Sequence, residues 1–118
     1  MAAPNIVNVT FIAAKTNTAN VTTTPSALVT NSTNSSQIYK INHLLATNVN
    51  TSPADITVDL FRASTSYPIA YTITVPEKST VVILGKDTSI YLEEGDTMRV
   101  WASANAYLFA TTSYEILS

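Results

Sequence analysis

Residues 55–62 read Asp-Ile-Thr-Val-Asp-Leu-Phe-Arg, and residues 69–75 read Ile-Ala-Tyr-Thr-Ile-Thr-Val. Apolar residues recur at every second position, which is the periodicity of a β-strand with one buried face. Pro53 before the first stretch and Pro76 after the second belong to segments typical of turns, and residues 63–68 are typical of a loop. These two stretches therefore predict two strands of a sheet that has a buried face and an exposed face.

The same alternation extends over most of the chain. β-branched residues are abundant and helical periodicity is weak, so we expect strands almost everywhere. The further predicted strands cover residues 6–13, 20–24, 27–30, 37–49, 80–84, 89–92, 97–104 and 107–117. Short strands with turns at roughly 8–12-residue spacing predict an all-β antiparallel sandwich of eight to nine strands, either jelly-roll or immunoglobulin-like.

Three predicted strands carry specific expectations about which side chains are buried. In residues 37–49, the odd positions from Tyr39 to Val49 form one stripe, which makes His43 a core or interface residue. Residues 80–84 are continuously apolar in their middle, which predicts cover on both faces. In residues 97–104, Arg99 and Trp101 lie out of phase with the apolar positions. We therefore expect Arg99 and Trp101 on the opposite side of their strand, as a candidate contact surface.

The polar residues are unusually uncharged and unevenly distributed. The chain has 118 residues, enough for one domain, and only 12% of them are charged. Residues 1–36 contain a single charged residue, Lys15, and half of them are Ser, Thr or Asn. We expect this segment to be an N-terminal arm or a set of edge strands, attached to a sandwich core at residues 37–118. Val21, Leu28 and Val29 favour some strand order there and are candidate contacts with neighbouring proteins.

Composition excludes several classes of function. The chain has no Cys, one His and two Gly, so we expect no disulfide, no thiolate chemistry, no multi-imidazole metal site and no phosphate-binding loop. A net charge of −2 gives no electrostatic footprint for nucleic acid. No apolar run reaches the length of a membrane span, and no secretory signal is evident. We expect no cofactor, no nucleic-acid partner and no membrane partner.

Carboxylates provide the remaining candidates for chemistry. Asp87 and the run Glu93-Glu94-Gly95-Asp96 could offer oxygen ligands to calcium, but a solvated turn fits their spacing better. Asp55 and Asp59 lie four apart on one strand, where paired carboxylates could perform acid–base catalysis. Their alternation with apolar residues is that of any half-exposed strand, and no partner base is indicated. We therefore expect a protein that is not an enzyme.

The C-terminal two-thirds resembles a known family. The most specific segment is Leu92-Glu93-Glu94-Gly95-Asp96, followed by an alternating strand. The segments that carry the resemblance are Ile38–Asn42, Ala46–Val49, Ala54–Val58, Ala70–Pro76, Ser79–Val82, Ile90–Val100, Ala102–Ala104 and Ser113–Glu115. Together they resemble small virion structural proteins of tailed bacteriophages, notably phages of cyanobacteria. Residues 1–36 lie outside the resemblance.

The resemblance implies an all-β, non-enzymatic component of a phage particle. The expected role is a capsid cement or decoration protein on the virion surface, which contacts the major capsid protein and forms a homo-oligomer such as a trimer. The alternative is a neck, tail or fibre component, with a carbohydrate- or receptor-binding role supported by aromatic stacking. Low charge agrees with both, because copies of a nearly neutral sandwich repel one another little.

Overall fold

A computed structural model describes residues 10–118 of the chain. The described part contains nine strands and one short 3₁₀-helix: β1 (Ile12–Val21), β2 (Ser26–Thr30), β3 (Ile38–Asn48), β4 (Ala54–Arg62), β5 (Thr65–Val75), β6 (Thr80–Leu84), η1 (Lys86–Thr88), β7 (Ile90–Leu92), β8 (Thr97–Ala102) and β9 (Leu108–Leu117). The first predicted strand lies partly outside the described residues, and within them β1 begins at Ile12.

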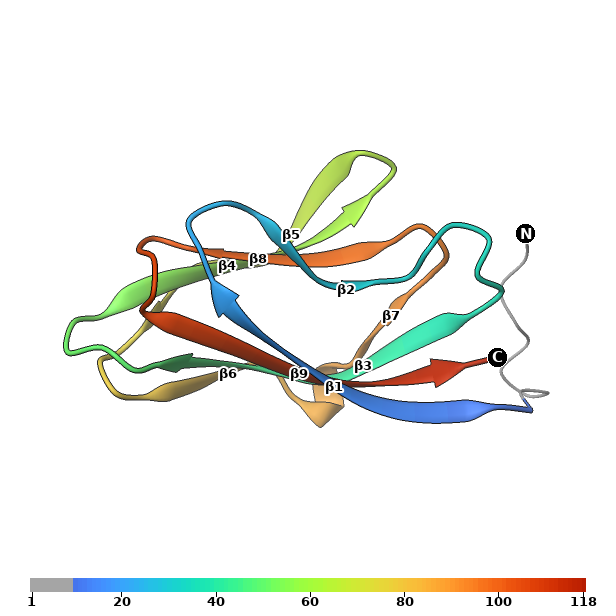
Figure 1. The fold of residues 1–118 in the computed structure, drawn as a ribbon, viewed down its shortest axis with the longest axis horizontal. Coiled ribbons are helices and arrows are strands. Elements are labelled where there is room, and N and C mark those ends of the chain that lie inside the picture. The colour runs from blue at the N-terminus through green and yellow to red at the C-terminus, as the bar shows by residue number, and fades with distance from the viewer. Residues whose placement is uncertain (1–9) are drawn as a thin grey trace.

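The strands form two antiparallel sheets that face each other, seen in Figure 1 as an upper and a lower layer. The five-stranded sheet has the order β1-β9-β3-β6, with β7 also paired to β3. The four-stranded sheet has the order β2-β8-β4-β5. The predicted all-β antiparallel sandwich is confirmed.

The strand partners are nested along the chain. β4 pairs with β5, β3 with β6 and β7, β2 with β8, and β1 with β9. A chain paired in this way is one long hairpin rolled into two sheets, which is the jelly-roll arrangement. Of the two architectures left open by the sequence, the topology therefore selects the jelly roll.

The uncharged N-terminal segment supplies an edge strand to each sheet. β1 forms one edge of the five-stranded sheet and pairs with β9 over its whole length, from Ile12 opposite Leu117 to Val21 opposite Leu108. β2 forms one edge of the four-stranded sheet beside β8. Both strands that the structure describes before position 37 are thus part of the sandwich.

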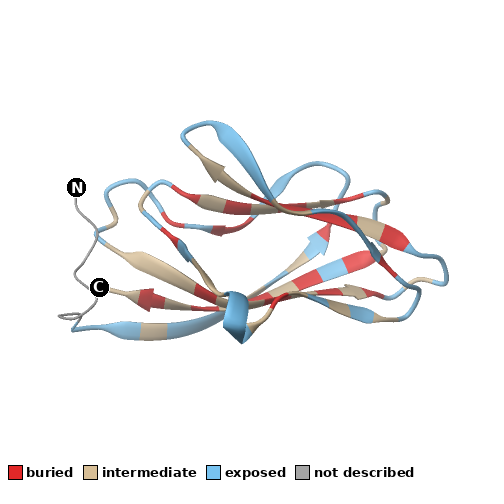
Figure 2. Ribbon diagram, turned by 180° about the vertical axis from the view of Figure 1, so that it is seen from behind, coloured by how far each residue is buried: buried red, intermediate tan, exposed pale blue. Residues whose placement is uncertain are grey.

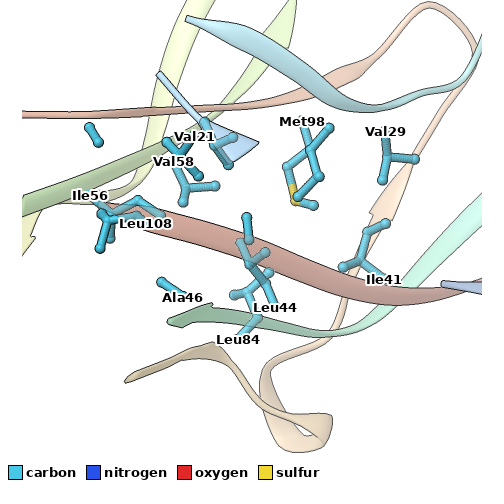
Figure 3. Packing of buried hydrophobic residues seen from close by; sticks show 14 of the residues in the cluster. Val21, Val29, Ile41, Leu44, Ala46, Ile56, Val58, Leu84, Met98 and Leu108 are labelled. Atoms are coloured by element: carbon cyan, nitrogen blue, oxygen red, sulfur yellow. The ribbon is translucent and has the colours of Figure 1, made fainter. Parts of the chain in front are cut away.

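The core lies between the sheets, and Figure 2 shows buried residues in the strands of both layers. Aliphatic side chains from the two layers interdigitate there, as Figure 3 shows for residues from β3, β4, β8 and β9. The largest fully buried apolar side chains are Ile41, Leu44, Ile56, Leu92, Met98 and Leu108. Burial of this kind contributes roughly 25 cal/mol per Å² of apolar surface removed from water, which makes it the main stabilising term.

A bulge in β3 breaks the predicted stripe of odd positions. The pairing with β9 shifts between Ile41 and His43, so Asn42 has no direct partner. A bulge moves every later side chain to the other face of the strand. Before the bulge the odd-numbered Ile41 is buried, whereas after it the even-numbered Leu44 and Ala46 are buried. Leu45 is only partly buried. The expectation for odd positions after Ile41 is therefore wrong, and His43 lies outside the core.

Two other expectations are corrected, one in each sheet. One face of β6 is open to solvent, so its apolar middle is not covered on both faces, and Val82 is 61% exposed. The segment expected as a loop at residues 63–68 is a two-residue turn followed directly by β5. Ala63 and Ser64 both adopt positive φ there, the conformation of the tight turns that match strand twist. Pro68 is tolerated within β5 because β5 is an edge strand.

Candidate functional site

Arg99 and Trp101 lie on the outer face of the four-stranded sheet. Alternation in β8 places Met98, Val100 and Ala102 in the core and turns the two candidates away from it, as the sequence pattern predicts. The Arg99 guanidinium lies 4.0 Å from the ring centroid of Phe61 and 5.8 Å from that of Trp101. The result is a cation held between two aromatic rings on neighbouring strands.

Arg99 is also tied to a buried carboxylate. Its Nε donates to Asp59 Oδ1 at 3.1 Å and its Nη2 donates to Asp59 Oδ2 at 2.6 Å, a two-point ion pair across β4 and β8. Asp59 is fully buried. Burial raises the pKa of Asp59, but hydrogen bonds from Arg99 and Ser66 and the charge of Arg99 outweigh it, so the pKa lies below its ordinary value.

This arrangement leaves Asp59 and Arg99 little chemistry to offer a ligand. The carboxylate stays ionised and its oxygens already accept hydrogen bonds from Arg99 and Ser66. Asp55, the other expected acid–base candidate, is only half-buried and accepts a hydrogen bond from Thr74. The two carboxylates thus have different partners and are not hydrogen-bonded to each other.

Val21, Leu28 and Val29 do not lie on a surface. Val21 closes the core from the end of β1, and a bulge in β2 between Ala27 and Val29 lets the consecutive Leu28 and Val29 both turn inward. Their fractional exposures are 1%, 6% and 2%. Their role in this fold is to seal the sandwich beneath its edge strands, which corrects the expectation that their side chains face neighbouring proteins.

The acidic turn before β8 is held by an ion pair rather than left to solvent. Arg62 Nε donates to Asp96 Oδ1 at 2.8 Å, and Arg62 Nη2 lies 2.9 Å from Glu93 Oε2. Asp96 is 2% exposed. The hydrogen bond that Arg62 donates to Asp96 is the main cause of the raised pKa of Arg62. Gly95, at φ +86°, donates its backbone N–H to Asn31 and so joins the turn to the end of β2. The expectation of a solvated turn is wrong for Asp96.

An open depression of about 590 Å³ lies over β3, β9 and η1. It is lined by Ala14, Lys40, Asn42, His43, Lys86, Ser113 and Glu115. The β3 bulge lies at this place, between Ile41 and His43, and Asn42 donates to Glu115 across the rim. His43 Nδ1 is buried without a hydrogen-bond partner among the described residues. The surroundings mix cations with a carboxylate, so the depression has no single electrostatic preference.

A second depression, of about 320 Å³, is lined by apolar and aromatic side chains of β5 and β6. Its lining residues are Ile69, Ala70, Tyr71, Ile73, Val81, Val82 and Ile83. We call it the β5/β6 groove. Tyr71, Ile73 and Val82 are all classed as exposed, at 69%, 39% and 61%. Exposed apolar side chains gathered in this way are typical of contact surfaces between proteins.

The sequence analysis missed the β5/β6 groove. The alternation at residues 69–75 predicts a strand with one buried face, and the apolar run at 80–84 predicts a strand covered on both faces, so neither pattern indicates an exposed apolar surface. The feature of the sequence that could have indicated the groove is the absence of charged residues from both β5 and β6. What the sequence could not show is that these two strands end their sheets side by side.

Two kinds of feature, a metal-binding cluster and a membrane-spanning helix, are not found among residues 10–118. No group of three or more His, Asp or Glu side chains comes together there in a way that could hold a metal ion. None of the helical structure in this part of the chain is long and apolar enough to cross a membrane.

The fold and these surfaces define a jelly-roll sandwich whose edge strands β1, β2, β5 and β6 carry a single charged residue, Lys15. No protein-family model matches the chain, and no curated protein matches it. Among solved structures it is similar to a protein chain from work on Bacillus endospore appendages, described as "a novel family of disulfide-linked pili". The TM-score is 0.56 at 16% sequence identity, over 99% of this chain and 95% of that one. Similarity at this identity shows a shared fold.

Proposed function

We propose that this protein is a non-enzymatic structural subunit of a larger protein assembly. The observation that carries the proposal is the character of the sheet edges. β2, β5 and β6 contain no charged residue and β1 contains only Lys15, although edge strands of monomeric proteins are commonly guarded by charges. Ionised groups elsewhere, notably Asp59 and Arg99, are satisfied within the fold.

The particular assembly we propose is the particle of a tailed phage, with the chain as a cement protein on the head. This proposal is supported by the resemblance of residues 37–118 to phage structural proteins and by a fold that presents contact surfaces rather than a reactive site. The partner would be the major capsid protein. The mechanism would be adhesion, in which buried interface area links neighbouring capsomers.

Immunogold electron microscopy of purified phage particles tests this proposal. An antibody raised against the recombinant chain should label heads, and heads lacking the chain should break at lower temperature or osmotic shock. Label confined to tails would move the subunit to the neck, tail or fibre. No label on any particle would refute the phage assignment.

The structural similarity favours a second candidate, a subunit of an extracellular filament. The likeness extends over nearly the whole of both chains. The related structure is described as disulfide-linked, whereas this chain has no Cys, so disulfide bonds between copies of this chain could not hold such a filament together. Negative-stain microscopy of the purified chain distinguishes the candidates, because only a filament subunit should form regular fibres without a capsid.

A further inference from the structure

The sandwich has two open sides, each formed by one edge strand from each sheet. On one side β1 lies beside β2, and on the other β5 lies beside β6. Within the described residues, each of these four strands pairs with a neighbour on one side only. Apart from the Leu28 carbonyl of β2, which accepts a hydrogen bond from the Asn17 side chain, their outer N–H and C=O groups are therefore not used by a neighbouring strand.

Strand direction makes the two sides compatible with each other. Every step along β1-β9-β3-β6 is antiparallel, so β1 and β6 run in opposite directions at the two ends of the sheet. The same holds for β2 and β5 at the ends of β2-β8-β4-β5. A second copy placed alongside in the same orientation therefore brings its β1 antiparallel to β6 and its β2 antiparallel to β5. Both sheets would continue without a change of pairing pattern.

Apolar surface on both sides provides the driving force. The β5/β6 groove exposes Tyr71, Ile73 and Val82, and on the other side Phe11 and Ile12 are exposed at the beginning of β1. Burying such side chains against a second copy removes apolar area from water. Lys15 is the one charged residue in the four edge strands, so no like-charge pair opposes the contact.

β1 is the best suited of the four edges to receive a strand. All ten of its residues pair with β9 without a register shift, so it is long and regular. β5, in contrast, contains Pro68, and its pairing with β4 shifts register twice. A regular edge without bulges, guarded by one charged residue, Lys15, has few of the devices that prevent strand addition.

We propose that copies of this chain associate head to tail, with the β1/β2 side of one copy docked on the β5/β6 side of the next. This inference rests on the proposed structural function and specifies its partner as a second copy. Because the two surfaces are different, the contact does not close on itself in a pair. It generates a row, and the right-handed twist of the sheets turns successive copies about the row axis.

Two blocked variants test the contact. Tyr71→Lys with Val82→Lys places charges in the groove, and Ile12→Lys with Thr18→Lys places charges on β1, all at exposed positions. Light scattering and sedimentation velocity should show wild-type species that grow with concentration beyond the 12.7 kDa chain. Each variant alone should be monomeric. Their equimolar mixture should give heterodimers and nothing larger, because each variant keeps the surface that the other has lost.

Val49→Lys is the matched control, since Val49 is 54% exposed but lies in neither open side. This variant should associate like the wild type. Circular dichroism verifies that each variant folds, and the single Val82→Lys and Ile12→Lys variants replace any double variant that does not.

Three results would overturn the inference. These are a wild-type chain that stays monomeric at all concentrations, a blocked variant that dimerises alone, and a mixture that stays monomeric. If the chain is monomeric but the antibody still labels phage heads, head-to-tail association is refuted and the structural function stays intact. Absence from every particle and fibre would refute the structural function itself.

Discussion

The Arg99 region and the β5/β6 groove face solvent from neighbouring parts of the sandwich, yet they differ in how far their groups are satisfied. Around Arg99, a guanidinium, a carboxylate and two aromatic rings are partners of one another. In the groove, apolar side chains face water beside backbone edges that carry no further strand. The comparison shows that a charged or aromatic residue type does not by itself identify a contact surface. Exposed apolar side chains and backbone groups without a partner strand are the better guide.

The largest expected effect tests whether the Arg99 region is structural. Asp59→Ala removes the buried partner of a guanidinium whose side chain is 22% exposed, so we expect the free energy of unfolding to fall by about 3 kcal/mol. Urea denaturation followed by tryptophan fluorescence measures it. Asp55→Ala is the control on the same strand and should cost less than about 1 kcal/mol, because Asp55 only accepts a hydrogen bond from Thr74. Equal losses in the two variants would contradict the structural role.

A second large effect separates core from contact surface within the N-terminal segment. Leu28→Ala should destabilise the monomer by about 2–3 kcal/mol, since Leu28 is 6% exposed and its removal leaves a cavity between the sheets. Thermal unfolding measured by circular dichroism gives the change. Ala27→Ser next to it, at an exposed position, should change stability by less than about 0.5 kcal/mol. A Leu28→Ala chain of wild-type stability would mean that β2 is not part of the core.

The pH dependence of stability should report the Asp59–Arg99 pair. Because the pKa of Asp59 is lowered in the folded state, the unfolded chain takes up a proton first as pH falls. The contribution of Asp59 is present above its unfolded pKa, near 4, and is lost as pH falls through the folded value. Urea titrations between pH 7 and pH 3 should therefore show that the free energy of unfolding falls less steeply with decreasing pH in Asp59→Asn than in the wild type. Parallel curves would show that the pair does not couple folding to protons.

The smallest expected effect is in the groove. Val82→Thr removes exposed apolar surface without disturbing the core, so the monomer should unfold within about 0.5 kcal/mol of the wild type. Denaturation at a concentration where the chain is monomeric measures it. A loss above about 1 kcal/mol would identify Val82 as a core residue and weaken the contrast with Leu28.

The sequence predicted the fold class and most strand positions because alternation at residues 55–62, 69–75 and 97–104 is a local signal. It failed where a single residue changes the phase, as at Asn42 in β3 and Leu28 in β2, since a bulge leaves no clear local signature. It also could not show which strands end a sheet, because edges follow from long-range pairing. Consequently the sequence predicted the correct face of β8 for Arg99 and Trp101, but it did not predict the β5/β6 groove.

The nested pairing has a consequence for synthesis on the ribosome. β1 emerges first among the described strands, but its sheet partner β9 is made last, after nearly all of the chain between them. Such long-range pairing is slow to form and leaves early strands exposed to other chains. The edge strand with the longest uninterrupted pairing register is therefore the one that is unpartnered for longest during translation. Neighbouring nascent chains on one messenger RNA would meet β1 before the chain's own β9 does.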